Sequence, residues 1–172
     1  FLMKKLKIII FTTIFVVFSF KQVFSNDKIF FVDLEYLINN TNIGKKTLTK
    51  INKLNEENLS KLKNKETELR NIENEIKNKQ NVIDEVQFKK EIDSFKIKAK
   101  KYNDEKKIII SDFNKYKKDK LNDLFNAINP IIQKYMDDNS IEILIDAKYV
   151  FMGKNSSDIT KIMLEEINKK IN

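Results

Sequence analysis

Nearly eighty consecutive residues, from about Lys45 to about Asp123, contain no Gly, no Pro and no Cys. Glycine and proline are the residues that most often interrupt helices, so this stretch can form helices without a break. Apolar side chains recur along it every three or four positions. Such spacing places one narrow apolar seam on a long helix. A helix with a seam of this kind needs a partner that covers it.

The seam keeps a seven-residue repeat in each half of the stretch. In the first half the slots hold Leu48, Asn55, Leu62, Leu69, Ile76 and Ile83, with a companion set of Ile51, Asn58, Lys65, Ile72, Lys79 and Val86. In the second half they hold Ile92, Ala99, Lys106, Phe113 and Lys120, with Phe88, Phe95, Tyr102, Ile109 and Tyr116 between them. The two halves therefore use different frames.

The change of frame near Ile83 predicts that the chain reverses direction there. Asn78, Asn81 and Asp84 are weak helix formers. Asp84 followed by Gln87 has the spacing of a capping box that starts a second helix. We therefore expect two antiparallel helices joined near residues 78–84, the first running from about 44 to about 81. One continuous rod is the alternative, because neither Gly nor Pro marks the turn.

The first 25 residues have the pattern of a secretory signal peptide. Three lysines precede an apolar run of thirteen residues, Ile8 to Phe20, which is broken only by Thr12, Thr13 and Ser19. The small residue Ser25 then predicts cleavage between Ser25 and Asn26. The alternative is an uncleaved membrane anchor, although a membrane span needs about 20 apolar residues. Cleavage predicts an exported protein located in the periplasm.

Strand and helix signals flank the long helices on both sides. Before them we expect a strand over 26–33, a short helix capped by Asp33, and a loop from Asn39 to Gly44. After them, Pro130 predicts a kink or a joint in the returning helix. The expected elements beyond it are a strand over 141–146, a second strand over 147–152, a loop over 153–156, and a final amphipathic helix capped by Ser157 or Asp158.

The predicted fold class is therefore α+β and mostly helical, with a long helical hairpin projecting from a small body that contains strands. Residues 26–44 and 124–172 are expected to form this body, and residues 45–123 the arm. The body has only about 80 residues, which is near the lower limit for a self-sufficient core. Open strand edges also favour association between chains. The strand residues expected to take part in oligomerisation are Ile29, Phe31, Ile141, Ile143 and Ile145.

Charge is distributed unevenly along the chain. The full sequence carries a net charge of +8, and residues 45–120 hold 22 basic and 14 acidic side chains. Outside this range, residues 26–172 hold 7 basic and 11 acidic side chains. The arm is therefore basic, which predicts attraction to anionic partners, including weak contact with anionic membrane surfaces. Nucleic acid is not an expected partner, because export removes the chain from it.

The composition argues against an enzyme and against a metal site. The chain has no Cys and no His, which excludes disulfides and nucleophile–histidine pairs and removes the preferred zinc and copper ligands. It also lacks a glycine-rich phosphate loop. Adjacent acids such as Glu56 and Glu57 do not face one another on a helix, so they are solvated charges. We expect no catalytic residue and no cofactor.

The order of these features resembles the Skp/OmpH family of periplasmic chaperones. The resemblance lies in a signal peptide followed directly by an apolar strand that ends at Asp33, and in a Lys/Glu-rich hairpin of about eighty residues. It continues in Ile131-Ile132-Gln133-Lys134-Tyr135, Ile141-Glu142-Ile143-Leu144-Ile145-Asp146-Ala147 and Asn155-Ser156-Ser157-Asp158-Ile159-Thr160. The resemblance implies a homotrimer whose strands form the body and whose three hairpins surround a cavity. It further implies an ATP-independent holdase that binds unfolded outer-membrane β-barrel proteins and prevents their aggregation in transit.

Apolar residues that lie off the seam or near the tip of the arm are the candidates for contact with such clients. They are Leu54, Leu59, Val82, Phe88, Ile97, Ile108 and Ile110. The alternative for each is packing within its own hairpin. Two other functions stay open: a structural coiled-coil spacer or envelope tether without client binding, and a membrane-surface protein that uses its basic face and an uncleaved N-terminus.

Overall fold

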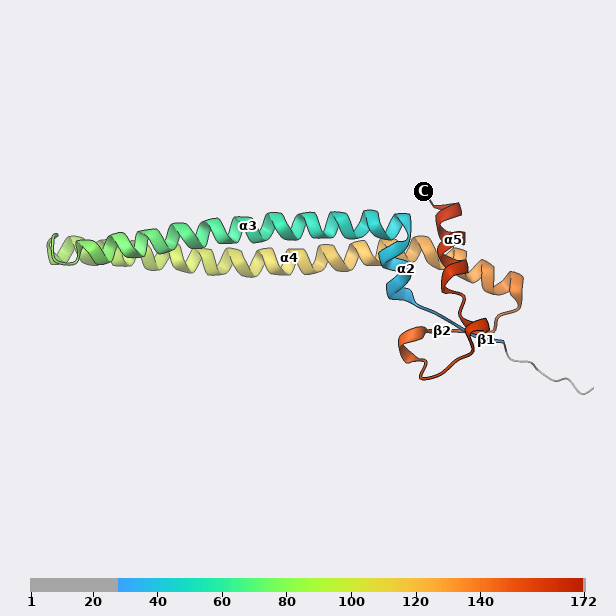
Figure 1. Ribbon diagram of the computed structural model, residues 1–172. Helices are drawn as coiled ribbons and strands as arrows, with labels where there is room; N and C mark the ends of the chain where they lie inside the picture. Colours follow the sequence, from blue (N-terminus) through green and yellow to red (C-terminus); the bar gives the residue numbers. More distant parts are fainter. Residues whose placement is uncertain (1–27, 172) are drawn as a thin grey trace, which may run out of the picture.

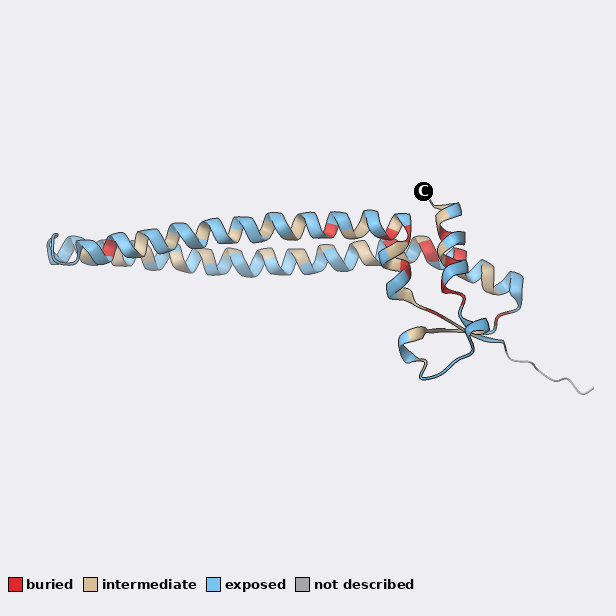
Figure 2. Cartoon of the chain, viewed as in Figure 1, coloured by how far each residue is buried: buried red, intermediate tan, exposed pale blue. Residues whose placement is uncertain are grey.

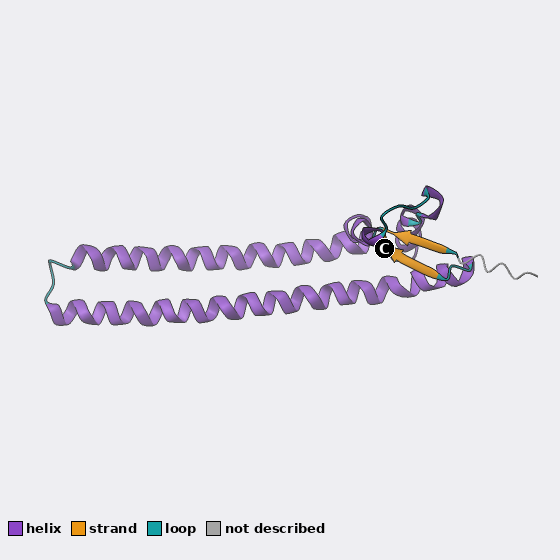
Figure 3. Cartoon of the chain, turned by 90° about the horizontal axis from the view of Figure 1, so that it is seen from below, coloured by secondary structure: helices purple, strands orange, loops and turns teal. Residues whose placement is uncertain are grey.

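The computed structural model describes residues 28–171, so the predicted cleavage site at Ser25 and Asn26 lies outside the described residues. Two long antiparallel helices form an arm, and the shorter elements gather at one end of it (Figure 1). This is the α+β, mostly helical fold expected from the sequence, with a two-stranded sheet as its β part. Figure 3 shows the hairpin turn at the end of the arm far from the two strands.

The chain enters through strand β1 (Ile29–Val32) and the short helix α2 (Leu34–Asn40). Asp33 caps α2 as predicted, since its carboxylate accepts a hydrogen bond from the Tyr36 backbone N–H at 2.8 Å. The predicted loop from Asn39 to Gly44 is wrong, because α2 ends where the next helix begins. Thr41 joins the two helices: its hydroxyl donates to the Leu37 carbonyl and accepts from the Gly44 N–H. One buried side chain thus replaces a loop.

Helix α3 (Asn42–Lys79) has 38 residues and would extend for about 57 Å at 1.5 Å per residue. A turn over residues 80–84 leads into helix α4 (Glu85–Asn139), which has 55 residues. Asp84 caps α4 by accepting a hydrogen bond from the Gln87 N–H at 3.0 Å. The predicted hairpin is therefore confirmed over the continuous rod.

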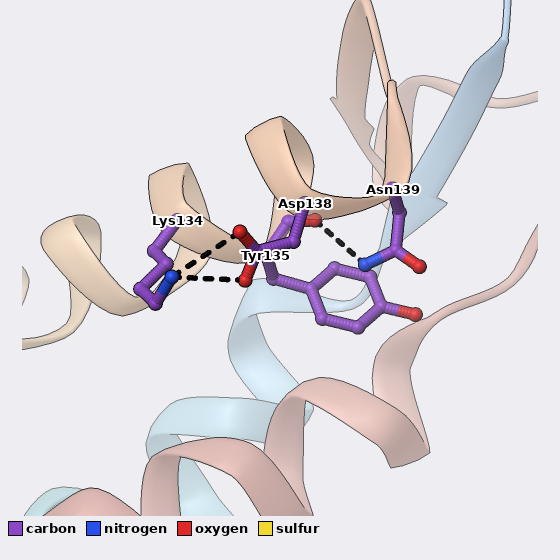
Figure 4. A network of polar contacts seen from close by, with 4 residues as sticks. All are labelled: Lys134, Tyr135, Asp138 and Asn139. Atoms are coloured by element: carbon purple, nitrogen blue, oxygen red, sulfur yellow. Dashed lines mark hydrogen bonds and ion pairs between the residues drawn. The ribbon is translucent and has the colours of Figure 1, made fainter.

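Helix α4 is longer than its partner because it continues through Pro130 into the body. Pro130 is exposed and lies inside the helix, and the last segment of α4 turns away from the line of the arm (Figure 1). Figure 4 shows how the last turns are held: Lys134 pairs with Asp138, and the Asn139 amide donates to the Tyr135 carbonyl. Ser140 then adopts a left-handed conformation with φ of 53°, which ends the helix.

Strand β2 (Ile143–Asp146) returns beside β1, and the two strands are parallel. Ile29 is registered with Ile143, and Val32 with Asp146. The predicted second strand over 147–152 is wrong. The Asp146 carboxylate accepts a hydrogen bond from the Lys148 N–H and turns the chain into a short 3₁₀ helix, η1 (Ala147–Tyr149), followed by a bend.

A second 3₁₀ helix, η2 (Asn155–Ser157), occupies part of the predicted loop and precedes the final helix α5 (Thr160–Lys170). The position before α5 is Ile159, which has no side-chain cap. Asp158 acts one residue further away, because its carboxylate accepts hydrogen bonds from the N–H and the hydroxyl of Thr160. The Thr160 hydroxyl oxygen in turn accepts the Asp33 N–H, which ties α5 to the end of β1.

The hydrophobic core lies where β1, α2, the last third of α4 and α5 meet (Figure 2). Met163 and Ile167, one turn apart on α5, are fully buried, and Leu37 and Leu124 are almost so. An isolated pair of parallel strands is weak, so this core is what stabilises the sheet. The members of the core are Val32, Leu37, Leu124, Ile128, Ile131, Ile141, Ile159, Met163 and Ile167.

Candidate functional site

The apolar seam between α3 and α4 is covered within the hairpin for most of its length. Ile51 and Ile76 are buried, and the seam residues of α3 between them are half-buried. The side chains between the seam positions are mostly exposed (Figure 2). Partial burial is what two helices achieve without a third, because each covers only one stripe of the other. The seam itself therefore offers little apolar surface to another molecule.

Two ion pairs connect α3 to α4 and define how the helices are aligned. Lys65 pairs with Glu105, and the Lys79 ammonium lies 3.1 Å from the Glu91 carboxylate. Both pairs are symmetric about residue 85, since 65 and 105 lie twenty positions from it and 79 and 91 lie six. Because the two ion pairs have the same midpoint in the sequence, neither helix contains an inserted residue between them. Residues of α3 and α4 that face each other can therefore be assigned along this part of the arm.

The pair in the middle of the arm corrects one seam position. Lys106 was expected on the seam, but it is exposed, and Glu105 takes the half-buried place opposite Lys65. A carboxylate meets the seam lysine there, whereas Lys106 would have put two ammonium groups together. The hydrogen bond from Lys65 holds the pKa of Glu105 below its usual value, with partial desolvation opposing it. The repeat alone does not distinguish residue 105 from residue 106, because both are polar neighbours on one turn.

The expected seam also ends earlier than the repeat suggests. Lys79 is exposed at the end of α3, and Val86 at the start of α4 is 67% exposed. The turn over 80–84 separates the two helices here, so Val86 is not covered, although Lys79 still pairs with Glu91 on the facing helix. The tip of the arm therefore presents apolar side chains to solvent.

Five of the seven residues predicted to contact clients are exposed on the arm. The exposed fractions are 58% for Leu59, 79% for Val82, 70% for Ile97, 60% for Ile108 and 46% for Ile110. Leu54 and Phe88 are half-buried. The five exposed residues are distributed from the middle of the arm to its tip and do not form one pocket. Such an arrangement suits many weak contacts with a flexible chain better than one rigid ligand.

Positive charge is concentrated where the arm leaves the body. Residues 45–54 of α3 include four lysines and no acid, and residues 115–120 of α4 include four lysines and one aspartate. Of these eight lysines, Lys120 pairs with Asp123, which raises the pKa of the Lys120 ammonium. Nearer the tip of the arm, Asp104 accepts a hydrogen bond from Lys100, which lowers the pKa of the Asp104 carboxyl and raises that of Lys100. The basic character predicted for the arm is therefore strongest at its base.

The strand residues expected to mediate oligomerisation occupy different environments. Ile29 and Ile143 are each 48% exposed and are directly paired in the sheet. Phe31 and Ile145 are half-buried. Ile141 lies before β2 and is buried in the core of its own chain, so it is not available on the surface. A more exposed group, which the sequence pattern places in a strand and does not mark as a surface, is Tyr149, Phe151 and Met152.

No helix within residues 28–171 has the length and apolarity that a membrane crossing requires. In the same part of the chain, no cluster of acidic side chains has the arrangement of a metal site. Within residues 28–171, the arm and the body each expose large apolar side chains.

Comparison with known families decides the relationship of this chain. The model of a family described as "Outer membrane protein (OmpH-like)" matches residues 28–167. The chain belongs to this family. The match covers nearly all of the residues that the structure describes, including both long helices and the core of the body. A search of curated proteins gives no significant match to this OmpH-like chain.

A solved structure shares the fold of this OmpH-like protein. It is a crystal structure from Caulobacter crescentus CB15, described as a candidate outer membrane chaperone (OmpH-like). The TM-score is 0.72 with 14% sequence identity, and the match covers 84% of this chain and 85% of that chain. Identity this low supports the common fold and not a residue-by-residue correspondence. The fold is therefore preserved although most side chains differ.

Proposed function

We propose that this OmpH-like protein is an ATP-independent periplasmic holdase chaperone. It binds unfolded outer-membrane β-barrel proteins and prevents their aggregation in transit. Membership of the OmpH-like family and the likeness to a candidate outer membrane chaperone both support a chaperone role. The observation that carries the proposal is a projecting arm whose seam is used internally while six large apolar side chains remain exposed among its lysines.

Physical reasons connect this arm to unfolded clients. An unfolded chain offers apolar side chains in no fixed arrangement, so scattered apolar contacts on a long surface can bind it without one pose. Lysines at the base of the arm add attraction to acidic client segments, which acts over about 8 Å at physiological salt. Neither contribution uses nucleotide hydrolysis or a cofactor. Binding strength would come from many weak contacts made together.

The proposal includes the organisation predicted from the sequence. Residues 1–25 are a cleaved signal peptide, residues 26–44 and 124–172 form the association body, and residues 45–123 form the arm. The protein assembles as a homotrimer through its body, with Ile29, Phe31, Ile143 and Ile145 near the contact. Amino-terminal sequencing of the exported protein is expected to start at Asn26. A sequence that starts upstream of residue 25 would favour an uncleaved anchor.

The decisive experiment measures light scattering while a urea-unfolded outer-membrane β-barrel protein is diluted into buffer. The wild-type chain from residue 26 should suppress aggregation, and a variant with Leu59, Ile97, Ile108 and Ile110 replaced by Ser should suppress it poorly. The matched control replaces the exposed residues Asn52, Asn64, Asn71 and Asn103 by Ser and should behave like wild type. Circular dichroism checks that both variants keep their helices. A wild-type chain that leaves aggregation unchanged would point to the structural spacer instead.

A further inference from the structure

One short segment of the body exposes three large apolar side chains within four positions. Tyr149, Phe151 and Met152 are 75%, 99% and 85% exposed. The segment is anchored at both ends. Its start is fixed by hydrogen bonds from the Lys148 N–H to Asp146 and from the Val150 N–H to the Ala147 carbonyl. Its end is fixed because Gly153 lies against the Phe31 ring, where an added Cβ would be 2.6 Å from a ring carbon. These side chains are therefore presented on a defined support.

A groove with matching chemistry lies on the same body. It has a volume of about 480 Å³ and lies where α2 and α4 meet the end of β2. Its apolar lining comes from Leu34, Ile38, Phe125 and Ala147, and its polar lining from Asp33, Glu35, Asp146 and Lys148. The chain's own Phe151 does not fill the groove, since that side chain is almost fully exposed.

Charges at the two surfaces are complementary. Asp33 caps α2 and Asp146 pairs with Lys148, so both carboxylates at the groove are already engaged. Glu35 is exposed and takes part in none of the ion pairs of residues 28–171. Lys154, three residues after Phe151, is likewise exposed and has no ion-pair partner in that range. An apolar segment with a nearby free ammonium thus matches an apolar groove with a free carboxylate.

The open edge of the sheet adjoins the same segment. One edge of β1 pairs with β2, and the other is covered because the Ile159 N–H donates to the Phe31 carbonyl at 3.0 Å. In the described part of the chain, the only backbone hydrogen-bond partners of β2 are β1 and Lys28, the residue before β1. Since β2 leads directly into η1, its uncovered edge is continuous with the exposed segment.

We propose that Phe151 and Met152 of one copy of this chain insert into the groove lined by Leu34, Ile38 and Phe125 of a second copy. Lys154 then approaches Glu35 of that second copy. The contact joins two different surfaces, so it is heterologous and can be repeated around a closed ring. It rests on the proposed self-association and names the side chains that make it. Aromatic side chains in apolar pockets are common hot spots of such interfaces.

The absence of cysteine in this chain allows a direct test by disulfide crosslinking. One preparation carries Phe151→Cys and another Glu35→Cys, and the two are mixed, unfolded, refolded together and oxidised. Non-reducing gels should show a dimer that contains one copy of each, identified by mass spectrometry. The control mixture of Phe151→Cys with Glu66→Cys, an exposed position on the arm, should show almost none. Equal yields in the two mixtures would overturn the proposal.

Two further measurements separate this contact from the proposed function. A double variant with both cysteines should form covalent oligomers no larger than the ring, whereas a disulfide confined to one chain would mean that the segment fills its own groove and would refute the contact. Phe151→Asp should keep the wild-type circular dichroism spectrum and raise the concentration for half-assembly about tenfold or more in native mass spectrometry. A wild-type protein that is monomeric contradicts the assembly itself. An assembled wild type with no mixed disulfide contradicts only this contact.

Discussion

Replacing one seam residue or one off-seam residue of α3 by alanine should distinguish side chains that stabilise the arm from side chains that bind clients. Ile51 is 4% exposed and lies on the seam, whereas Leu59, two turns later, is 58% exposed. Both substitutions remove three carbon atoms from the same helix. The difference between their effects therefore measures burial and little else.

The expected magnitudes follow from the exposed fractions. A fully buried carbon contributes about 0.8 kcal/mol, so Ile51→Ala loses about 2.3 kcal/mol of transfer free energy. The cavity left behind raises the loss in free energy of unfolding to about 2–4 kcal/mol. Leu59 has only about two fifths of its surface buried, which limits its loss to about 1 kcal/mol. In both variants the higher helix propensity of alanine offsets a few tenths of a kcal/mol of the loss in free energy of unfolding.

The assay is urea unfolding followed by circular dichroism at 222 nm, with all proteins at one concentration because self-association would otherwise change apparent stability. Aggregation of an unfolded β-barrel client is then measured at 25 °C, where both variants should be folded. Ile51→Ala should lose stability and keep its protective effect, and Leu59→Ala should keep most of its stability and lose part of its protection. Losses of stability that agree within about 0.5 kcal/mol would refute the assignment of the seam.

Two other substitutions test the junction between α2 and α3 and the ion pair between Lys65 and Glu105. Gly44→Ala should destabilise the protein by more than about 2 kcal/mol in urea unfolding, because the new Cβ would overlap the Ile38 carbonyl oxygen and lie 2.7 Å from the Thr41 hydroxyl oxygen. A neutral effect there would mean that α2 and α3 shift apart easily. The pKa of Glu105 is lowered in the folded arm, so its pair with Lys65 stabilises the fold above the ordinary carboxyl pKa and loses that effect as pH falls through the lower folded value. Thermal melting should therefore place Glu105→Gln below wild type at pH 7, and the gap should close below about pH 4; a gap that is constant with pH would contradict the pair.

The elements that the sequence predicts correctly are those with a periodic or local signal. The seven-residue repeat identified the two long helices, and the change of frame with Asp84 as a cap located the reversal between them. The cap at Asp33 was equally local, because a carboxylate reaches an N–H three residues later regardless of the rest of the fold. Errors occurred where two similar residues competed, as at Glu105 and Lys106. The choice between them depends on Lys65, which is forty positions away.

The sequence by itself determined that this chain has a basic, helical arm and strand segments that precede and follow the arm in the sequence. Those properties depend on residue spacing and composition, which act over a few turns of helix. Only the tertiary structure decided which apolar residues are covered. Ile141 is buried in the core of the body, while Phe151, of similar hydrophobicity and in an expected strand, is almost fully exposed. Burial depends on what lies opposite a side chain, and the residues opposite come from parts of the chain that are more than a hundred positions apart.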